Sequence, residues 1–289
     1  MGRIRPMSDA RALLDSLFAT AVAAAHPAAF LPRLLPAPPK GRIVLLAAGK
    51  AAGSMAEVAE QVYLDQRGLP PQRLTGIAVA RHGYGRPTRV VEMVEAGHPI
   101  PDAAGLAAAE RALALAASAG PDDLVLVLMS GGASANWIAP AAGIAFADKQ
   151  AVTRALLRCG AHIGEINCVR KHLSRIKGGR LARHAFPAKV ATIAVSDVPG
   201  DDPAVIGSGP TVPDPTTLAE ARAIIAKYRL DVPEAITRAL ADPANESPKP
   251  GDRVFAATSF TLAARPADAR GRDGRGRASD SRRGRACRG

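Results

Sequence analysis

The stretch LVLVLMSGGASANWIAP, residues 124–140, joins six consecutive apolar residues to a loop rich in serine and glycine. The apolar run 124–129 matches a strand buried inside a parallel sheet. The glycines that follow leave the backbone free to turn sharply. In open α/β sheets the ligand lies beyond the carboxyl ends of the strands, so this stretch predicts a central strand that ends at a functional loop.

The rest of the chain repeats this arrangement, because short β-branched runs alternate with alanine-rich helical stretches. The pattern predicts an α/β fold, a three-layer Rossmann-like sheet with helices on both faces. Six strands are expected in one sheet, at 42–47, 76–80, 90–95, 124–129, 189–195 and 253–257. Helices are expected at 9–25, 52–66, 103–119, 146–159, 163–173, 217–228 and 233–241, with proline-rich connectors at 31–41 and 247–251.

Composition fits a soluble globular enzyme of 289 residues, with 47% apolar and 22% charged residues. No apolar stretch reaches the roughly 18 residues of a membrane span, and the N-terminal segment is predicted to be an amphipathic helix rather than an export signal. Three cysteines without a CxxC pair indicate neither a disulfide framework nor a zinc site. We therefore expect a cytoplasmic protein.

The net charge of +12 is unevenly distributed. Residues 265–289 hold nine Arg and three Asp, a net of +6, and contain no large apolar residue. Such a segment cannot bury enough surface to offset the entropy of ordering, so residues 259–289 are expected to form a disordered tail after an α/β domain at 1–258. Nonspecific binding of nucleic-acid phosphates by this tail is the alternative.

Two loops have the character of anion sites. Lys50 follows the first strand and precedes a helix, where backbone amides, the helix dipole and an ammonium together favour phosphate or carboxylate. The loop lacks the glycines and Ser/Thr of a Walker A motif and is not GxGxxG, and a merely solvated lysine is the alternative. The second loop can form an anion-binding nest from Ser130, Gly131, Gly132, Ala133 and Ser134, or can be a purely structural turn.

Acidic residues dominate a third loop, SDVPGDDPAVIGSGP at 196–210. Asp197 lies directly at the end of a strand, where a carboxylate can bind a divalent cation or take a proton from a hydroxyl group. Helix capping is the simpler interpretation for Asp201 and Asp202. Further backbone amides are available from Gly207, Ser208 and Gly209.

A basic helix lies between the second and third loops, in EINCVRKHLSRIKGGRLA at 165–182. Four cations in this stretch, Arg170, Lys171, Arg175 and Lys177, could neutralise an anionic ligand, although from the residues alone we interpret them as solvated surface residues. His82 and His98 lie in glycine-rich turns and are interpreted as structural hydrogen-bonding groups. The histidine spacing does not indicate a metal site.

Four long segments carry a resemblance to a known family: 80–105, 130–140, 165–182 and 196–217. In their order along the chain and in their residues, these segments resemble the motifs of the bacterial glycerate 2-kinase family. Some members of that family are called hydroxypyruvate reductases. The resemblance implies ATP-dependent phosphorylation of D-glycerate at its 2-hydroxyl with Mg²⁺. It assigns Lys50 and Asp197 to catalysis, Asp197 also to Mg²⁺, and the glycine-rich loops to substrate and phosphate.

The chain departs from this family in two ways. Ala133 stands where a third glycine is common. After residue 258 the glycine-rich motifs of the family's C-terminal domain do not follow, and we expect a reading-frame change between 259 and 265 that impairs activity. An NAD(P)H-dependent hydroxypyruvate reductase and an inactive or nucleic-acid-binding fragment are the alternatives, the first weakened by the missing dinucleotide fingerprint.

Overall fold

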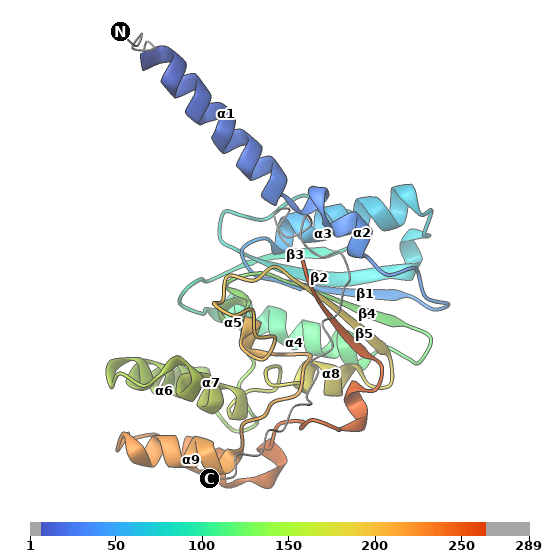
Figure 1. The fold of residues 1–289 in the computed structure, drawn as a ribbon. Helices are drawn as coiled ribbons and strands as arrows, with labels where there is room; N and C mark the ends of the chain where they lie inside the picture. The colour runs from blue at the N-terminus through green and yellow to red at the C-terminus, as the bar shows by residue number, and fades with distance from the viewer. Residues whose placement is uncertain (1–6, 264–289) are drawn as a thin grey trace, which may run out of the picture.

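The computed structural model describes residues 7–263, in which six parallel strands form one sheet of order β3-β2-β1-β4-β5-β6 (Figure 1). The predicted α/β class and the single sheet are confirmed. The strands are β1 (Ile43–Ala48), β2 (Leu74–Arg81), β3 (Glu92–Ala96), β4 (Leu124–Met129), β5 (Lys189–Ala194) and β6 (Thr258–Leu262).

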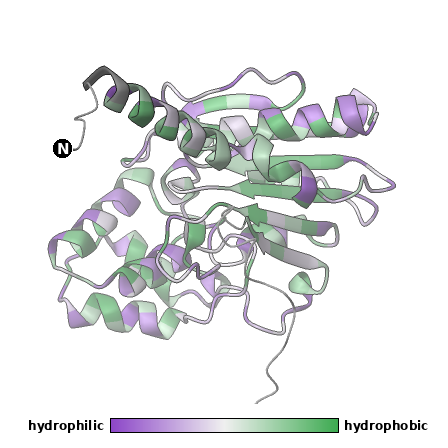
Figure 2. Cartoon of the chain, turned by 45° about the horizontal axis from the view of Figure 1, so that its top comes forward, coloured by the Kyte–Doolittle hydropathy of each residue, from purple (hydrophilic) through white to green (hydrophobic). Residues whose placement is uncertain are grey.

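Helices cover both faces of the sheet. On one face α4 (Ala103–Ala117) and α8 (Arg180–Ala185) pack on the side chains of Val44 and Leu46. On the other face α2 (Leu31–Leu34) and α3 (Ala52–Glu60) pack on Leu45. Every residue of β1 and β4 is buried, which explains why both strands read as unbroken apolar runs (Figure 2).

A third apolar cluster joins four further helices, named here the four-helix lobe. It consists of α6 (Phe146–Arg158), α7 (Ile163–His172), α9 (Leu218–Lys227) and α10 (Glu234–Ala241). In Figure 1 the lobe lies beyond α4 and α8, away from the sheet. The chain between β4 and β5 therefore leaves the sheet, builds part of the lobe and returns through α8.

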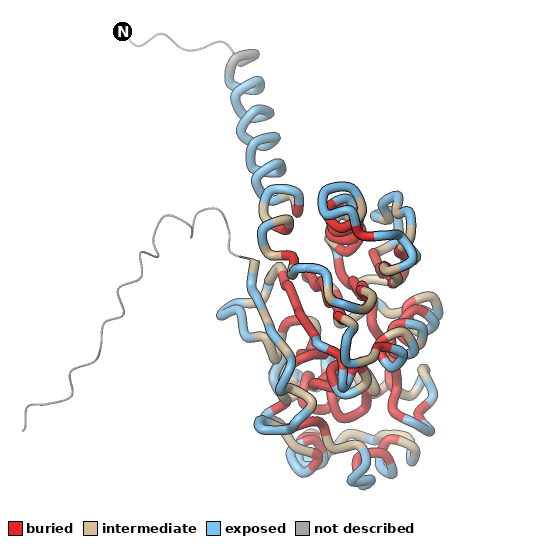
Figure 3. The backbone as a smooth tube through the Cα atoms, turned by 90° about the vertical axis from the view of Figure 1, so that its right-hand side faces the viewer, coloured by how far each residue is buried: buried red, intermediate tan, exposed pale blue. Residues whose placement is uncertain are grey.

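The helix α1 (Met7–Ala25) extends away from the body of the molecule (Figures 1 and 3). Its large apolar side chains are exposed, from 51% for Leu13 to 71% for Phe18. Within residues 7–263, no helix combines the length and the apolar character needed to cross a membrane.

The last strand differs from the prediction. The expected strand at 253–257 is wrong, because residues 253–255 form a 3-10 turn and the strand is Thr258–Leu262. Pairing with β5 sets this register: Thr192 lies opposite Phe260, whose side chain packs against the core. The predicted boundary at 258 thus falls at the first residue of β6. The rest of the predicted tail, 264–289, lies outside the described residues.

For the other elements, the observed boundaries differ less from the predicted ones. The predicted helix at 52–66 is α3 followed by a π-helical turn at Gln61–Gln66, and the connector at 31–41 contains the short α2. A four-residue helix, α5 (Ala133–Asn136), follows the glycine loop after β4.

Candidate active site

Three adjacent strands end at one edge of the sheet and bring the predicted loops together. Ala48, Met129 and Ala194 are aligned in register across β1, β4 and β5. The Lys50 Nζ atom lies 3.1 Å from Oδ2 of Asp197, and the Lys50 backbone N–H donates to the Gly131 carbonyl oxygen at 2.8 Å. The loops around residues 50, 130 and 200 therefore form one site.

Two glycines allow this close approach. A Cβ atom on Gly49 would lie 2.4 Å from the Ser130 carbonyl oxygen, and one on Gly131 would lie 2.0 Å from Oδ2 of Asp197. A side chain at position 49 would push the loops apart, whereas one at position 131 would displace the Asp197 carboxylate. The Ser130 hydroxyl group strengthens the junction by accepting a hydrogen bond from the Ala51 N–H at 2.9 Å.

The loop after β4 has the geometry of an anion-binding nest. Gly132 adopts a left-handed conformation with φ of 89°, which favours glycine. Within the described chain, the N–H groups of Gly131 and Gly132 have no hydrogen-bond partner. Ala133 begins α5 and is 1% exposed, outside the left-handed region, so alanine in place of the family's third glycine leaves the loop intact.

The loops after β4 and β5 line a cavity of about 450 Å³. Asn167 and Arg170, on one face of α7, close it from the side of the four-helix lobe. Its other lining residues come from the loops after β4 and β5 and from the start of α7: Ser130, Gly131, Gly132, Ser134, Ile163, Asp197, Val198, Pro199, Val205, Ile206, Gly207 and Ser208.

Ser134 is held by a network of hydrogen bonds on the floor of this cavity. Its Oγ atom accepts from the Arg170 guanidinium at 2.6 Å and from the Lys177 ammonium at 3.1 Å, and lies 2.8 Å from Oγ of Ser208. Ser208 is buried with φ of 64°, an unfavourable conformation for a residue other than glycine. This strained residue therefore joins the loop after β5 to the loop after β4.

Charges at the site remain accessible to a ligand. The Lys50 and Asp197 side chains are 48% and 54% exposed, so their ion pair contributes little to stability. His98 lies against Gly132, where a Cβ atom would come within 2.7 Å of the imidazole ring. Burial, followed by the charges of Lys50 and Arg81, lowers the pKa of His98, so its ring is neutral at neutral pH.

With this geometry in view, the chain can be compared with known proteins. A family model described as a domain of unknown function, DUF4147, matches residues 13–241. This chain belongs to the DUF4147 family.

Named relatives of this DUF4147 protein include kinases. The D-glycerate 2-kinase of Thermotoga maritima is 41% identical over 209 residues, which are 72% of this chain and 48% of that protein. The glycerate 2-kinase of Pyrococcus horikoshii is 42% identical over 199 residues, 68% of this chain and 43% of that protein. A protein of Agrobacterium vitis that carries a hydroxypyruvate reductase name is 48% identical over 266 residues, 90% of this chain and 59% of that protein.

A crystal structure of glycerate kinase from Thermotoga maritima shares the fold, with a TM-score of 0.77 and 35% identity over 89% of this chain and 59% of that one. These matches confirm the resemblance found in the sequence motifs. The chain spans about half the length of the curated relatives it matches.

Four of the predicted site residues of this DUF4147 protein are not among the residues that line the cavity: Lys50, Ala133, Lys171 and Gly209. Lys50 still contacts the site through Asp197, and Ala133 directly follows the glycine loop. Lys171 is 4% exposed, and its ammonium pairs with the buried Asp214 at 3.1 Å, so it does not line the cavity. Gly209 also lies outside the lining, where it packs on Ala204. The interpretation of the basic helix as solvated surface is wrong for Lys171 and Lys177, which packing of the lobe buries.

The sequence analysis gave no site role to Asn167, and it named Lys177 as a possible anion-neutralising cation before interpreting it as solvated. Asn167 precedes Arg170 by three residues, a spacing that places both on one helical face, so this signal was readable. Lys177 follows the end of α7 and reaches the network only through the tertiary fold. Asp202 accepts from the Ala204 N–H at 2.8 Å, which closes a local turn. It does not cap a helix as predicted, because the 3-10 helix that follows begins after Val205 and has no side-chain cap.

Asp197 is the one predicted metal ligand. The described residues contain no group of three or more His, Cys, Asp or Glu side chains able to hold a metal ion. A complete protein cage for Mg²⁺ is therefore not formed by residues 7–263. A single carboxylate still fits this ion, because Mg²⁺ commonly takes one or two protein carboxylates and completes its shell with substrate phosphates and water.

Proposed function

We propose that this chain provides the α/β part of a glycerate 2-kinase, which transfers the γ-phosphoryl group of ATP to the 2-hydroxyl of D-glycerate. The observation that carries the proposal is that Gly131 and Gly132, whose amides have no partner within residues 7–263, and Asp197 line one cavity, and that the Lys50 ammonium pairs with Asp197 at 3.1 Å. Relatives named as glycerate 2-kinases support the choice of substrate.

The proposed roles follow from the charge of the reaction. Phosphoryl transfer requires positioning and neutralisation of phosphate charge more than covalent help from the protein. The ammonium of Lys50 and the amides of the glycine loop stabilise the negative oxygens of the substrates. Asp197 accepts a hydrogen bond from the glycerate 2-hydroxyl and orients its oxygen toward the phosphorus atom. The new O–P bond forms as the bond to the ADP oxygen breaks, and the proton of the 2-hydroxyl passes to the Asp197 carboxylate.

ATP supplies the phosphoryl group, and Asp197 would hold a Mg²⁺ ion, which would neutralise phosphate charge when bound. Arg170 lies across the cavity from the loops and is suited to a second phosphate or to the glycerate carboxylate. We also propose a cytoplasmic location, which the free thiols of Cys159 and Cys168 support.

A hydroxypyruvate reductase is the second candidate, favoured by the name of the Agrobacterium vitis relative. The first βα turn argues against it. In dinucleotide-binding turns, glycines leave space for the pyrophosphate. Here the space beside Gly49 is filled by the Ser130 backbone, and a Cβ on Gly53 would lie 2.9 Å from the Tyr84 carbonyl oxygen. Protein atoms thus occupy the positions that the cofactor would need.

The two candidates are separated by a paired assay on the purified chain. ATP with D-glycerate is monitored by ADP release, and enolase is added to identify the product, because enolase dehydrates 2-phosphoglycerate directly but not 3-phosphoglycerate. NADH with hydroxypyruvate is monitored by absorbance at the nicotinamide band. The kinase proposal expects ADP release and an enolase-competent product. NADH oxidation without ADP release would refute the kinase proposal. A chain that failed to bind either ATP or D-glycerate would also refute it.

A further inference from the structure

A second cavity, of about 270 Å³, lies between α6, the end of α7 and the segment 99–101, and is named here the α6 cavity. Four cationic side chains line it: Lys149, Arg154, Arg170 and Lys177. No carboxylate is among its lining residues in the described part of the chain. Apolar side chains such as Ile100 and Leu157 complete the walls.

Two of these cations are deeply buried without an acidic partner. Lys149 is 2% exposed, and its ammonium donates to the Leu173 carbonyl oxygen. Lys177 is 1% exposed and donates to Ser134 and to the Trp137 carbonyl oxygen. Within residues 7–263 neither lysine forms an ion pair. An ammonium group has three donors, so Lys149 retains two for another acceptor.

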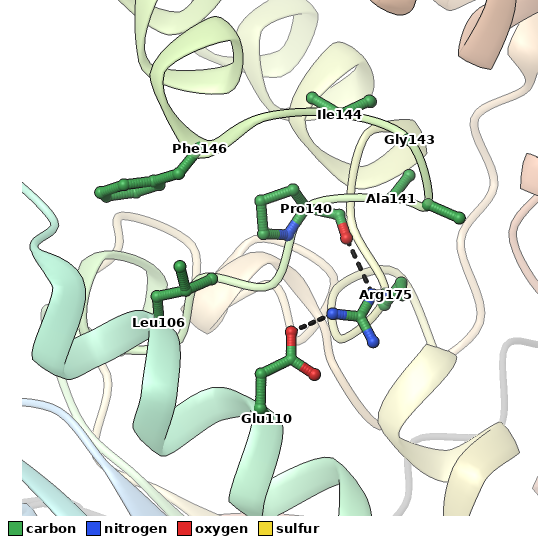
Figure 4. A pocket seen from close by; sticks show the side chains of 9 residues that line it. Leu106, Glu110, Pro140, Ala141, Gly143, Ile144, Phe146 and Arg175 are labelled. Atoms are coloured by element: carbon green, nitrogen blue, oxygen red, sulfur yellow. Dashed lines mark hydrogen bonds and ion pairs between the residues drawn. The ribbon is translucent and has the colours of Figure 1, made fainter.

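Two neighbouring cations, Lys171 and Arg175, have acidic partners. Lys171 pairs with Asp214, and in the adjacent cavity of about 320 Å³ the Arg175 guanidinium pairs with Glu110 and donates to the Pro140 carbonyl oxygen (Figure 4). Those cations are neutralised within the protein. In the α6 cavity the compensating negative charge is missing from the described chain.

Burying a cation without an anion is unfavourable, because the group loses its hydration and gains no Coulombic attraction. Burial, followed by repulsion from Arg170, lowers the pKa of both Lys149 and Lys177 well below its usual value. Such costs concentrate at sites where a ligand supplies the missing charge.

We propose that the α6 cavity is an anion-binding site for a small organic molecule that bears a carboxylate or phosphoryl group, with Lys149 as its principal cation. Lys149 and Arg154 of α6, which both line the cavity, contact the anion, while Ile100 and Leu157 contact the apolar part of the molecule. The volume lies near the lower end of the usual range for ligand pockets, roughly 300–1,000 Å³, and suits a compact metabolite.

The α6 cavity is separate from the active-site cavity, although Arg170 lines both. Lys149 and Arg154 do not line the active-site cavity, and Lys50 and Asp197 do not line the α6 cavity. Through Arg170, occupancy of the second site would act on the Ser134 network beside the proposed reaction. The proposal does not depend on kinase activity, because it rests on buried cations outside the catalytic loops.

The test measures thermal stability of the full chain against increasing concentrations of three probes: inorganic phosphate, D-glycerate and 2-phosphoglycerate. A ligand that binds the folded state raises the melting temperature by mass action. The probe that gives the largest shift shows whether the anion is a free phosphate, a carboxylate or a phosphorylated metabolite. Four variants locate the site: Lys149→Met, Arg154→Gln, Arg158→Gln and Asp197→Asn.

We expect Lys149→Met to melt at or above the wild-type temperature without ligand, because a buried unpaired charge is removed, and to bind the anion at least about tenfold more weakly. Arg154→Gln changes an exposed residue, keeps the fold and weakens binding. Arg158→Gln, one turn further along α6 and outside the cavity lining, leaves binding unchanged. Asp197→Asn also leaves it unchanged while abolishing kinase turnover.

Absence of a shift with all three probes would overturn the proposal, as would wild-type anion affinity in both Lys149→Met and Arg154→Gln. Loss of the anion shift in Asp197→Asn would place the ligand in the active-site cavity and overturn it as well. A failed kinase assay with anion binding that depends on Lys149 would refute the proposed function alone.

Discussion

Lys50 shows how a single residue at a strand end acquires its role from its neighbours. The sequence predicted that Lys50 follows the first strand. It could not distinguish a lysine that binds a ligand from a merely solvated one, because both have the same local sequence. Its ammonium lies 3.1 Å from Asp197, and its own backbone holds Gly131. The position of Lys50 is therefore set by residues 80 to 150 positions away in the sequence, across the edge of the sheet.

Replacing Lys50 by Met should remove charge stabilisation while preserving the length of the side chain. We expect kcat for ATP-dependent glycerate phosphorylation to fall about 10²–10³-fold, the usual cost of deleting one preorganised donor. The melting temperature should change little, because the ion pair is exposed. Steady-state kinetics and a thermal melt test both statements, and kcat within twofold of wild type would remove Lys50 from the chemistry.

Gly131 provides a second test of the site. In Gly131→Ala the new Cβ atom would lie 2.0 Å from Oδ2 of Asp197, and the half-exposed carboxylate would have to rotate away from Lys50. A displacement of about 1 Å can reduce the rate about 10²-fold, which is the loss we expect in kcat. Gly120→Ala is the control, because the nearest atom to its Cβ is 4.0 Å away. Equal rates in the two variants would contradict the assignment.

The helices of the lobe depend on pairs between elements as well as on apolar packing. Glu165, in the first turn of α7, accepts from the Lys227 ammonium and the Tyr228 hydroxyl group, both at 2.7 Å. These two residues end α9, so one carboxylate joins two helices. Glu165 also accepts from the His162 N–H in a capping box at 3.0 Å.

This junction predicts a pH dependence of stability. The Lys227 hydrogen bond, followed by that of Tyr228, lowers the pKa of Glu165 from 4.5 to about 2. A lowered carboxyl pKa stabilises the fold above the unfolded value, and this contribution is lost as the pH falls from about 4.5 toward 2. The difference in melting temperature between wild type and Glu165→Gln should shrink over that range. For Glu234→Gln, an exposed position on α10, the difference should stay constant.

At the scale of the whole molecule, a buried ion pair holds the lobe to the segment that returns toward β6. Asp214 is fully buried and accepts from Lys171 of α7 at 3.1 Å and from the Ser247 hydroxyl group at 2.9 Å. Three segments distant in the sequence thus meet at one carboxylate. Such pairs stabilise little relative to apolar residues, but removing one partner leaves a buried charge uncompensated.

Asp214→Ala should therefore reduce the free energy of unfolding by about 3–5 kcal/mol. Adding Lys171→Met to the same chain should recover part of that loss, because the unpaired ammonium is then absent. Urea denaturation of the two variants and the wild type gives the comparison. A double variant no more stable than Asp214→Ala would show that the pair's charge is not the cause.

Local sequence patterns predicted much of this architecture. The strand Leu124–Met129 was predicted to the residue, because a strand buried on both faces has an unbroken apolar sequence. The helices at 146–158 and 163–172 were predicted to within one residue, because caps and periodicity are local. β6 was displaced by five residues, since its register is set by pairing with β5 rather than by its own composition.

The sequence by itself determined the α/β class, the order of strands and helices, and the loops on which Lys50, Ser130 and Asp197 lie, because periodicity and glycine placement act over a few residues. Only the tertiary structure decided that Lys171 is neutralised by Asp214, while Lys149 and Lys177 are buried without an acidic partner among residues 7–263. Burial and charge pairing depend on how distant segments pack together. The local sequence around a lysine therefore does not predict whether that lysine will pair with a carboxylate.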